Sequence, residues 1–285
     1  MARGFLPIPR RSRKESRMDI PTIFDPYPAG PDIEVLPSYF PIPGYGVLPV
    51  NAFVLKAREP VLVDTGLWAL SDEFMKNLSS VIDPDDLRWL WLTHNDQDHI
   101  GSLHRMLEAA PRLKVVTTYL GIGKMSLFRP LPPNRVHLLN PGQSIDVGGR
   151  RLTSVRPPTY DAPETTGLYD HKTSTLFSAD CFGALLSEPA GGADEIGSSR
   201  LKDGLVFWTR VDSPWLHTID RDGFAKTISY FYGLSPRTIL SSHLPAAYGM
   251  ADELLQYIAL VPDEKPFVGP DQKAFAAMMG GKPSA

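Results

Sequence analysis

The feature that most constrains the fold is a dense apolar run at residues 87–92 that leads directly into a polar loop. Because a short apolar run bounded by charged and turn residues is typical of a buried strand, we expect a strand there. Residues 100–110 then show the helical spacing of apolar side chains, and Pro111 ends it. The loop between them reads Thr93-His94-Asn95-Asp96-Gln97-Asp98-His99, which places chemically active side chains at the end of a buried strand.

Strands and helices alternate along the rest of the chain. Apolar patterning predicts further strands at residues 33–36, 50–56, 61–63, 114–117, 136–139, 144–147, 151–155, 167–169, 175–178 and 238–242. It predicts further helices at residues 71–81, 119–128, 220–234, 252–260 and 271–279. Several strands are joined by short turns, which favours an α/β fold of two mixed sheets flanked by helices over a doubly wound parallel sheet. Residues 184–217 are expected to form a Gly/Ser/Pro-rich loop that carries Phe207, Trp208 and Trp215.

Composition excludes several classes of protein. With 42% hydrophobic and 21% charged residues the chain is globular, and a net charge of −3 gives no general attraction to nucleic acid or membrane. No apolar run approaches the ~18–20 residues of a membrane span. The single cysteine, Cys181, excludes an intramolecular disulfide and a Cys-rich metal site, so we expect a cytoplasmic protein.

The first 17 residues carry six basic side chains against one acidic side chain. They lack the apolar segment of a signal peptide. Residues 1–17 are therefore expected to be a disordered basic arm, or an over-extended start with Met18 as the true initiator. Residues 18–285 are expected to form a single domain.

Four candidate metal ligands lie within six residues of the loop after the apolar run: His94, Asp96, Asp98 and His99. Two ligands separated by one residue can converge on one ion in a tight turn, as His94 and Asp96 would. Asp98 and His99 point elsewhere and are candidates for a second ion. The pattern favours a metal site at the mouth of a rigid scaffold over a solvated turn.

Several segments resemble the metallo-β-lactamase fold superfamily. The segment Leu62-Val63-Asp64-Thr65-Gly66 and the loop that runs from Thr93 to Gly101 are similar to its two N-terminal motifs. Its hydrolases have a second histidine where this chain has Asp96, and a carboxylate there is typical of flavodiiron and related oxygen-binding di-iron proteins. Residues 176–183 resemble the segment that carries the bridging aspartate, here Asp180, and residues 239–243 resemble the strand that delivers the last histidine, His243. Residues 158–165 resemble a further ligand segment, with Asp161 in the place of a histidine and Tyr160 or Glu164 as alternatives.

The resemblance implies an αββα sandwich with a dinuclear centre. It assigns His94, Asp96 and Asp161 to one ion, Asp98, His99 and His243 to the other, and Asp180 to both. It also implies that Asp64 orients a ligand histidine. Four carboxylates supply a charge of −4, and hard oxygen donors suit iron or manganese better than zinc, so two iron ions are expected, with manganese or zinc as alternatives.

The function implied by this resemblance is the binding or reduction of O₂ or NO. Only 42 residues follow His243, too few for the flavodoxin-like domain of flavodiiron proteins, so no FMN domain and a separate electron-donor protein are expected. One alternative is a dinuclear hydrolase of an ester, lactone or thioester, in which Asp98 would act catalytically by positioning the attacking hydroxide. The others are a di-iron oxygenase of a biosynthetic pathway and a metal-free binding module.

Overall fold

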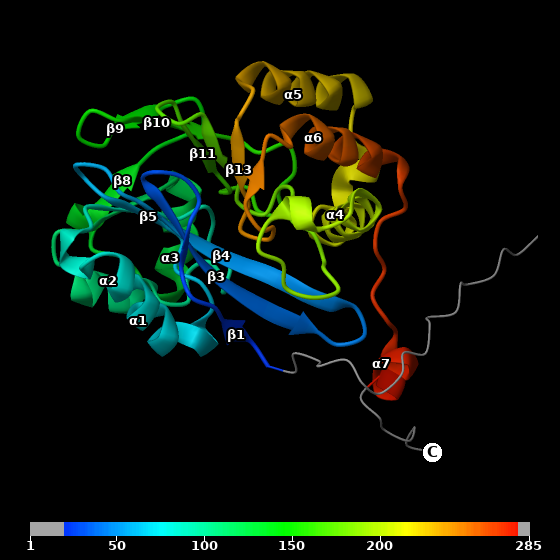
Figure 1. The fold of residues 1–285 in the computed structure, drawn as a ribbon, viewed down its shortest axis with the longest axis horizontal. Coiled ribbons are helices and arrows are strands. Elements are labelled where there is room, and N and C mark those ends of the chain that lie inside the picture. Colours follow the sequence, from blue (N-terminus) through cyan, green and yellow to red (C-terminus); the bar gives the residue numbers. More distant parts are fainter. Residues whose placement is uncertain (1–19, 279–285) are drawn as a thin grey trace, which may run out of the picture.

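The computed structural model describes residues 20–278, in which two β-sheets pack face to face between two layers of helices (Figure 1). These layers confirm the predicted α/β sandwich of two mixed sheets. The basic residues 1–17 lie outside the described residues, so the expectation for them stays a prediction. No helix among residues 20–278 combines the length and the apolar character needed to cross a bilayer.

The first sheet has the strand order β1-β3-β4-β5-β6-β7-β8, with β2 paired to β3. Pairing is antiparallel as far as β5 and parallel from β5 to β8. The strands are β1 Thr22–Ile23, β2 Tyr27–Pro28, β3 Ile33–Ile42, β4 Gly46–Leu55, β5 Val61–Val63, β6 Trp89–Trp91, β7 Lys114–Thr117 and β8 Val136–Leu138.

The second sheet has the order β14-β13-β12-β11-β10-β9, and only its β12–β13 pair is parallel. Its strands are β9 Ser144–Asp146, β10 Arg151–Val155, β11 Gly167–Asp170, β12 Thr175–Phe177, β13 Thr238–Leu240 and β14 Ala247–Tyr248. The facing sides of the two sheets form one apolar core. Within it the rings of Phe53 on β4 and Phe177 on β12 lie edge to face, with centroids 5.4 Å apart.

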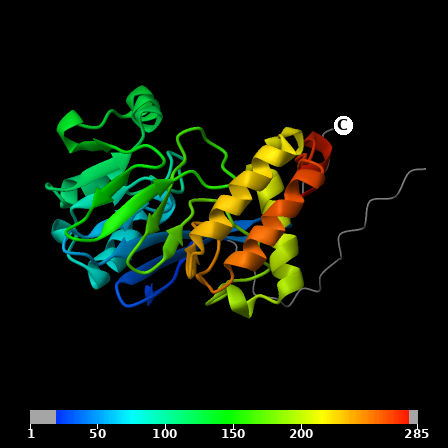
Figure 2. The ribbon, with the colours of Figure 1, turned by 90° about the horizontal axis from the view of Figure 1, so that it is seen from above.

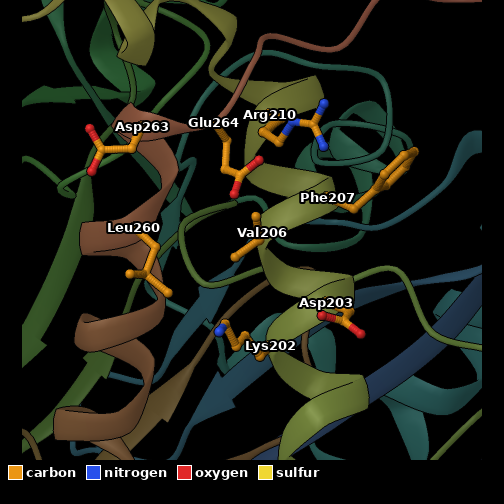
Figure 3. A pocket seen from close by; sticks show the side chains of 8 residues that line it. All are labelled: Lys202, Asp203, Val206, Phe207, Arg210, Leu260, Asp263 and Glu264. Atoms are coloured by element: carbon orange, nitrogen blue, oxygen red, sulfur yellow. The ribbon is translucent and has the colours of Figure 1, made fainter. Parts of the chain in front are cut away.

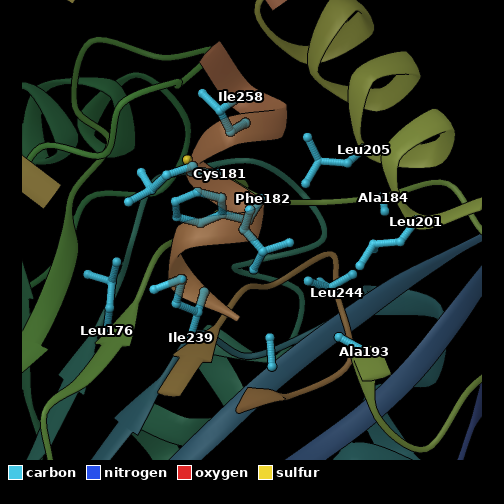
Figure 4. Close-up of a cluster of buried hydrophobic side chains, with 14 of the residues drawn as sticks. Leu176, Cys181, Phe182, Ala184, Ala193, Leu201, Leu205, Ile239, Leu244 and Ile258 are labelled. Carbon is cyan, nitrogen blue, oxygen red and sulfur yellow. The ribbon is translucent and has the colours of Figure 1, made fainter. Parts of the chain in front are cut away.

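Helices cover the outer face of each sheet. Buried side chains of α1 Ser71–Val81, α2 Leu103–Ala109 and α3 Tyr119–Phe128 pack on the first sheet. The second sheet is covered by α4 Ser198–Asp212, α5 Arg221–Leu234 and α6 Ala251–Leu260, whose apolar cluster includes Leu205 and Ile258 (Figure 4). Figure 2 shows α5 and α6 side by side. The remaining helical segments are η1 Trp68–Leu70, η2 Pro84–Asp86, η3 Pro133–Arg135, η4 Ala193–Glu195, η5 Pro214–Thr218, η6 Val261–Asp263 and α7 Gln272–Met278.

One sequence-based expectation is wrong. Residues 184–217 are not a loop, because they contain the 15-residue helix α4. Leu201, Leu205 and Thr209 recur at four-residue spacing and are buried, which is the helical pattern of an inward-facing stripe. The Ser and Gly residues around and within this segment conceal that stripe in the sequence. Phe207 and Trp208 therefore lie on a helix rather than in a loop.

Candidate metal centre

The loop after β6 is held in place by Asp64. This residue directly follows β5, the strand that pairs with β6. Asp64 is fully buried and adopts a positive φ of 58°. Its carboxylate accepts hydrogen bonds from the Thr93 backbone N–H at 2.8 Å and from the Thr93 hydroxyl at 2.7 Å. The His99 ring nitrogen Nδ1 donates to the same carboxylate at 2.8 Å. Asp64 therefore orients a histidine of the predicted site, as the sequence resemblance implied.

Each of three histidines has its Nδ1 atom engaged and its Nε2 atom directed into the site. His99 uses Nδ1 on Asp64, and His243 Nδ1 donates to the carbonyl of Pro49 at 2.7 Å. Because the Thr93 hydroxyl donates to Asp64, it accepts from His94 Nδ1, 3.2 Å away. This network keeps a proton on Nδ1 in all three rings, so Nε2 is the atom that each ring can offer to a metal.

The second sheet brings the remaining donors to the same edge. Asp161 precedes β11, Asp180 follows β12 and His243 follows β13. Asp180 lies at the centre, with its carboxylate oxygens 3.2 Å from His94 Nε2, 3.0 Å from His99 Nε2 and 3.1 Å from His243 Nε2.

The structure brings all seven predicted side chains together in overlapping groups of three. One group, whose donor atoms lie within 4.8 Å of one another, is His94, Asp96 and Asp161. A second is Asp98, His99 and His243, and a third is His94, His99 and Asp180. Asp180 thus shares a group with one histidine from each of the other two groups.

The alternatives to Asp161 have other contacts. The buried carboxylate of Glu164 accepts a hydrogen bond from the Lys124 ammonium on α3. The ring of Tyr160 packs against Trp215 at a centroid distance of 5.2 Å. Neither therefore takes the place that Asp161 occupies.

The buried nitrogen and oxygen atoms of the candidate ligands are arranged as they would be around a bound metal. His94, His99, Asp180 and His243 are at most 5% exposed. Within residues 20–278, His94 Nε2, His99 Nε2 and Asp180 Oδ1 nevertheless lack a hydrogen-bond partner, although they lie close together. Orphaned buried polar atoms are costly, so atoms that face a common point in this way are suited to a shared cation.

Neighbouring charges outweigh burial in setting the pKa values of these groups. Burial alone would lower the pKa of His243, but Asp180 and Asp98 raise it to about 9. Burial would likewise raise the pKa of Asp180, but His94, His99 and His243 hold it well below its usual range. The centre is therefore built around the negative charge of Asp180 surrounded by imidazoles.

Two side chains of α4 also reach the site, and sequence reasoning missed the contribution of both. Asp212 places a carboxylate oxygen within 4.8 Å of oxygens of Asp161 and Asp180. Burial and the charges of Asp180 and Asp161 raise the pKa of Asp212 to about 8. Trp208 lies one turn earlier, with its ring centroid 5.3 Å from that of His243. Its buried Nε1–H has no hydrogen-bond partner in the part of the chain that the structure describes. Only recognition of the helix, with residues 208 and 212 on one face, would have pointed to the pair.

Comparison with known proteins identifies the family. Residues 48–198, just over half of the chain, match the model described as "ODP family beta lactamase". The chain belongs to this family. The matched segment of this ODP-family chain contains every predicted site residue except His243.

Flavodiiron proteins are among the relatives of this ODP-family chain. It is 26% identical over 53% of its length to the anaerobic nitric oxide reductase flavorubredoxin of Pectobacterium atrosepticum, covering 30% of that protein. It is 29% identical over 49% of its length to a flavo-diiron protein of Clostridium acetobutylicum, covering 35% of that protein. The matching segment thus spans about a third of these curated relatives.

A solved structure shows the same fold. Rubredoxin oxygen:oxidoreductase from Desulfovibrio gigas matches 85% of this chain and 63% of its own, with a TM-score of 0.74 and 20% identity. At this identity the likeness shows the fold alone. The metallo-β-lactamase-like arrangement of two mixed sheets is thereby established for this chain.

Proposed function

We propose that this protein holds two iron ions between its two sheets and binds or reduces O₂ or NO. The observation that carries the proposal is the donor set: three imidazoles and four carboxylates in two trios, with Asp180 between them. Such a carboxylate-rich set compensates a higher positive charge than a histidine-rich one and favours iron or manganese over zinc. The names of the relatives, a nitric oxide reductase and an oxygen oxidoreductase, support the same class of reaction.

Seven side chains would bind the two ions, and three further groups would orient the histidines. His94, Asp96 and Asp161 would hold one ion, and Asp98, His99 and His243 the other, with Asp180 bound to both. Asp64, Thr93 and the Pro49 carbonyl would keep the three Nε2 atoms aimed inward by fixing the ring orientations. Ferrous ions bound there would supply electrons to the diatomic ligand.

The α4 side of the site contributes shape and polarity. Trp208 packs against His243, and its buried indole N–H has no hydrogen-bond partner among the described residues. A bound diatomic ligand could accept that hydrogen bond. We propose a separate electron-donor protein as the source of reducing equivalents, as the rubredoxin named in the relatives suggests.

The test is consumption of NO and of O₂ by iron-loaded protein in the presence of a chemical reductant. Wild type should consume at least one of the two gases, and Asp180→Asn should lose most of this activity and most of the second ion. An amide bridges two cations poorly and removes one negative charge. Consumption by neither protein, with stoichiometric zinc and fast lactone or ester hydrolysis in wild type, would establish the hydrolase alternative instead.

A further inference from the structure

Asp212 occupies an unfavourable position for an isolated carboxylate. It is the last residue of α4, where the helix dipole presents its negative end, and it lies against the carboxylates of Asp161 and Asp180. Among residues 20–278 no Lys, Arg or His nitrogen forms an ion pair with it, whereas Asp161 and Asp180 each lie within 4.0 Å of His94. A bound cation would offset this repulsion and stabilise the charged form of Asp212.

The three carboxylates are close enough together to share one cation. One oxygen of Asp212 accepts a hydrogen bond from the buried Ser213 hydroxyl at 3.1 Å, which orients the carboxylate. Donor oxygens of Asp212, Asp161 and Asp180 all lie within 4.8 Å of one another, close to the roughly 4 Å that separates opposite ligands of one ion. The neighbouring Asp180 Oδ1 and His94 Nε2 are buried and have no hydrogen-bond partner between residues 20 and 278.

We propose that Asp212 is an additional metal-binding carboxylate of this centre, sharing the ion on the His94 side with Asp161 and Asp180. The inference rests on the proposed dinuclear site and extends its donor set to five carboxylates and three imidazoles. Asp161 stands where the resemblance places a neutral histidine. Because it supplies an anionic oxygen instead, the ion on the His94 side is already biased toward hard cations. Asp212 increases that bias, and the ion it helps to hold would be one that prefers oxygen donors, such as Mn²⁺ or iron, rather than Zn²⁺.

The experiment compares metal binding by wild type, Asp212→Asn and a matched control, Asp203→Asn. Asp203 lies nine residues earlier on α4, hence on the opposite face of the helix. There it lines a surface pocket with Lys202 and Arg210 (Figure 3). Both substitutions remove one carboxylate from the same helix. A difference in metal binding between the two variants therefore depends on where the carboxylate lies, not on the loss of one charge.

Metal-stripped protein would be titrated with Mn²⁺, which is redox-stable and visible by electron paramagnetic resonance, alone and in competition with Zn²⁺. We expect two Mn²⁺ per chain in wild type and in Asp203→Asn. Asp212→Asn should bind one of the two ions at least tenfold more weakly, because even loss of an indirect partner costs a metal site 10–100-fold. Its preference should also move toward Zn²⁺.

Thermal unfolding separates a ligand from a merely structural residue. Without metal, Asp212→Asn should melt within a few degrees of wild type, and only the increase caused by Mn²⁺ should shrink. A lower melting temperature without metal together with unchanged Mn²⁺ affinity would overturn the inference. If Asp212→Asn does not fold, Asp212→Glu, which keeps the carboxylate, and Asp212→Ala replace it, with retained affinity expected only for the former.

The remaining outcomes distinguish this inference from the proposed function. Two tightly bound ions in both wild type and Asp212→Asn would refute the role of Asp212 and leave the dinuclear site intact. Failure of wild type to bind Mn²⁺, iron or Zn²⁺ would refute the dinuclear site and the inference with it.

Discussion

The carboxylate of Asp96 distinguishes this site from a histidine-rich one at the scale of a single side chain. Replacing it by imidazole in Asp96→His removes one negative charge and one hard donor next to His94 and Asp161. Trivalent iron then loses more stabilisation than divalent zinc, so we expect a retained fold, two bound ions and a lower iron-to-zinc ratio. The ratio is measured after loading from one equimolar mixture.

The exposed Asp203→His is the control for Asp96→His, because it makes the same chemical change outside the site. It should leave the metal ratio unchanged. An unchanged ratio in Asp96→His itself would mean that Asp96 does not bind metal.

Gly183 is a second residue on which the centre depends. A Cβ atom there would lie 2.7 Å from His243 Cβ, 2.7 Å from Trp208 Cδ1 and 2.9 Å from the Asp180 carbonyl. Gly183→Ala must therefore displace a predicted ligand or the Trp208 ring. We expect a loss of about 1–3 kcal/mol in the free energy of unfolding, and weaker metal binding, measured by urea titration and metal analysis.

Gly123 on α3 provides the matched control, because a Cβ there meets no atom within 4 Å. Gly123→Ala should be neutral or stabilise the protein by up to about 1 kcal/mol. Equal stability and metal content in both alanine variants would contradict the packing described around Gly183.

At the scale of elements, Arg150 ties the two sheets together. Its guanidinium, just before β10, donates to Asp170 at the end of β11 with distances of 3.0 and 2.6 Å, and to Asp32 before β3 at 3.0 Å. Arg150 and Asp170 are at most 4% exposed. Asp170→Asn leaves a buried guanidinium poorly compensated, so we expect a loss of about 3–5 kcal/mol at pH 7.

The Arg150–Asp170 pair also gives a pH dependence. Burial would raise the pKa of Asp170, but hydrogen bonds from Arg150 and Thr173 outweigh it and hold the pKa below its usual value. The stabilisation is therefore present above about pH 4 and is lost as the pH falls through the lowered pKa. Urea unfolding of wild type and Asp170→Asn should show a difference that is largest at pH 7 and shrinks in acid.

An exposed ion pair serves as the control for Asp170→Asn. Asp85 Oδ2 lies 3.0 Å from Arg112 Nη2, and both side chains are more than half exposed. Asp85→Asn should cost less than about 1 kcal/mol at any of these pH values. A comparable loss in the two variants would show that burial does not set the strength of the Arg150 pair.

Most elements were predictable because local pattern and packing agree. The helix at residues 71–81 and the strand at residues 151–155 have the bounds that apolar spacing indicates. Strand β3 is longer than predicted because Pro37 and Pro41 argue locally against a strand, whereas its pairing with β4 runs through both. Helix α4 was missed because most of its residues are polar or exposed, and only three of its side chains form the buried stripe that would indicate a helix.

At the scale of the whole molecule, the candidate site was predictable where its residues form motifs. The loop from His94 to His99 and the segments ending at Asp180 and His243 are recognisable in sequence, and the two sheets bring them to one edge. Asp212 and Trp208 have no such motif. They reach the site only because α4 packs on the second sheet, a long-range contact that local sequence does not encode.

The central claim is that the two sheets hold a pair of iron ions through Asp180 and its neighbours. It is tested most directly by the metal content and Mössbauer spectrum of protein loaded anaerobically from an equimolar mixture of ⁵⁷Fe²⁺, Mn²⁺ and Zn²⁺. We expect two iron ions per chain that become magnetically coupled on exposure to air. A site filled with zinc, or a single uncoupled iron, would contradict it.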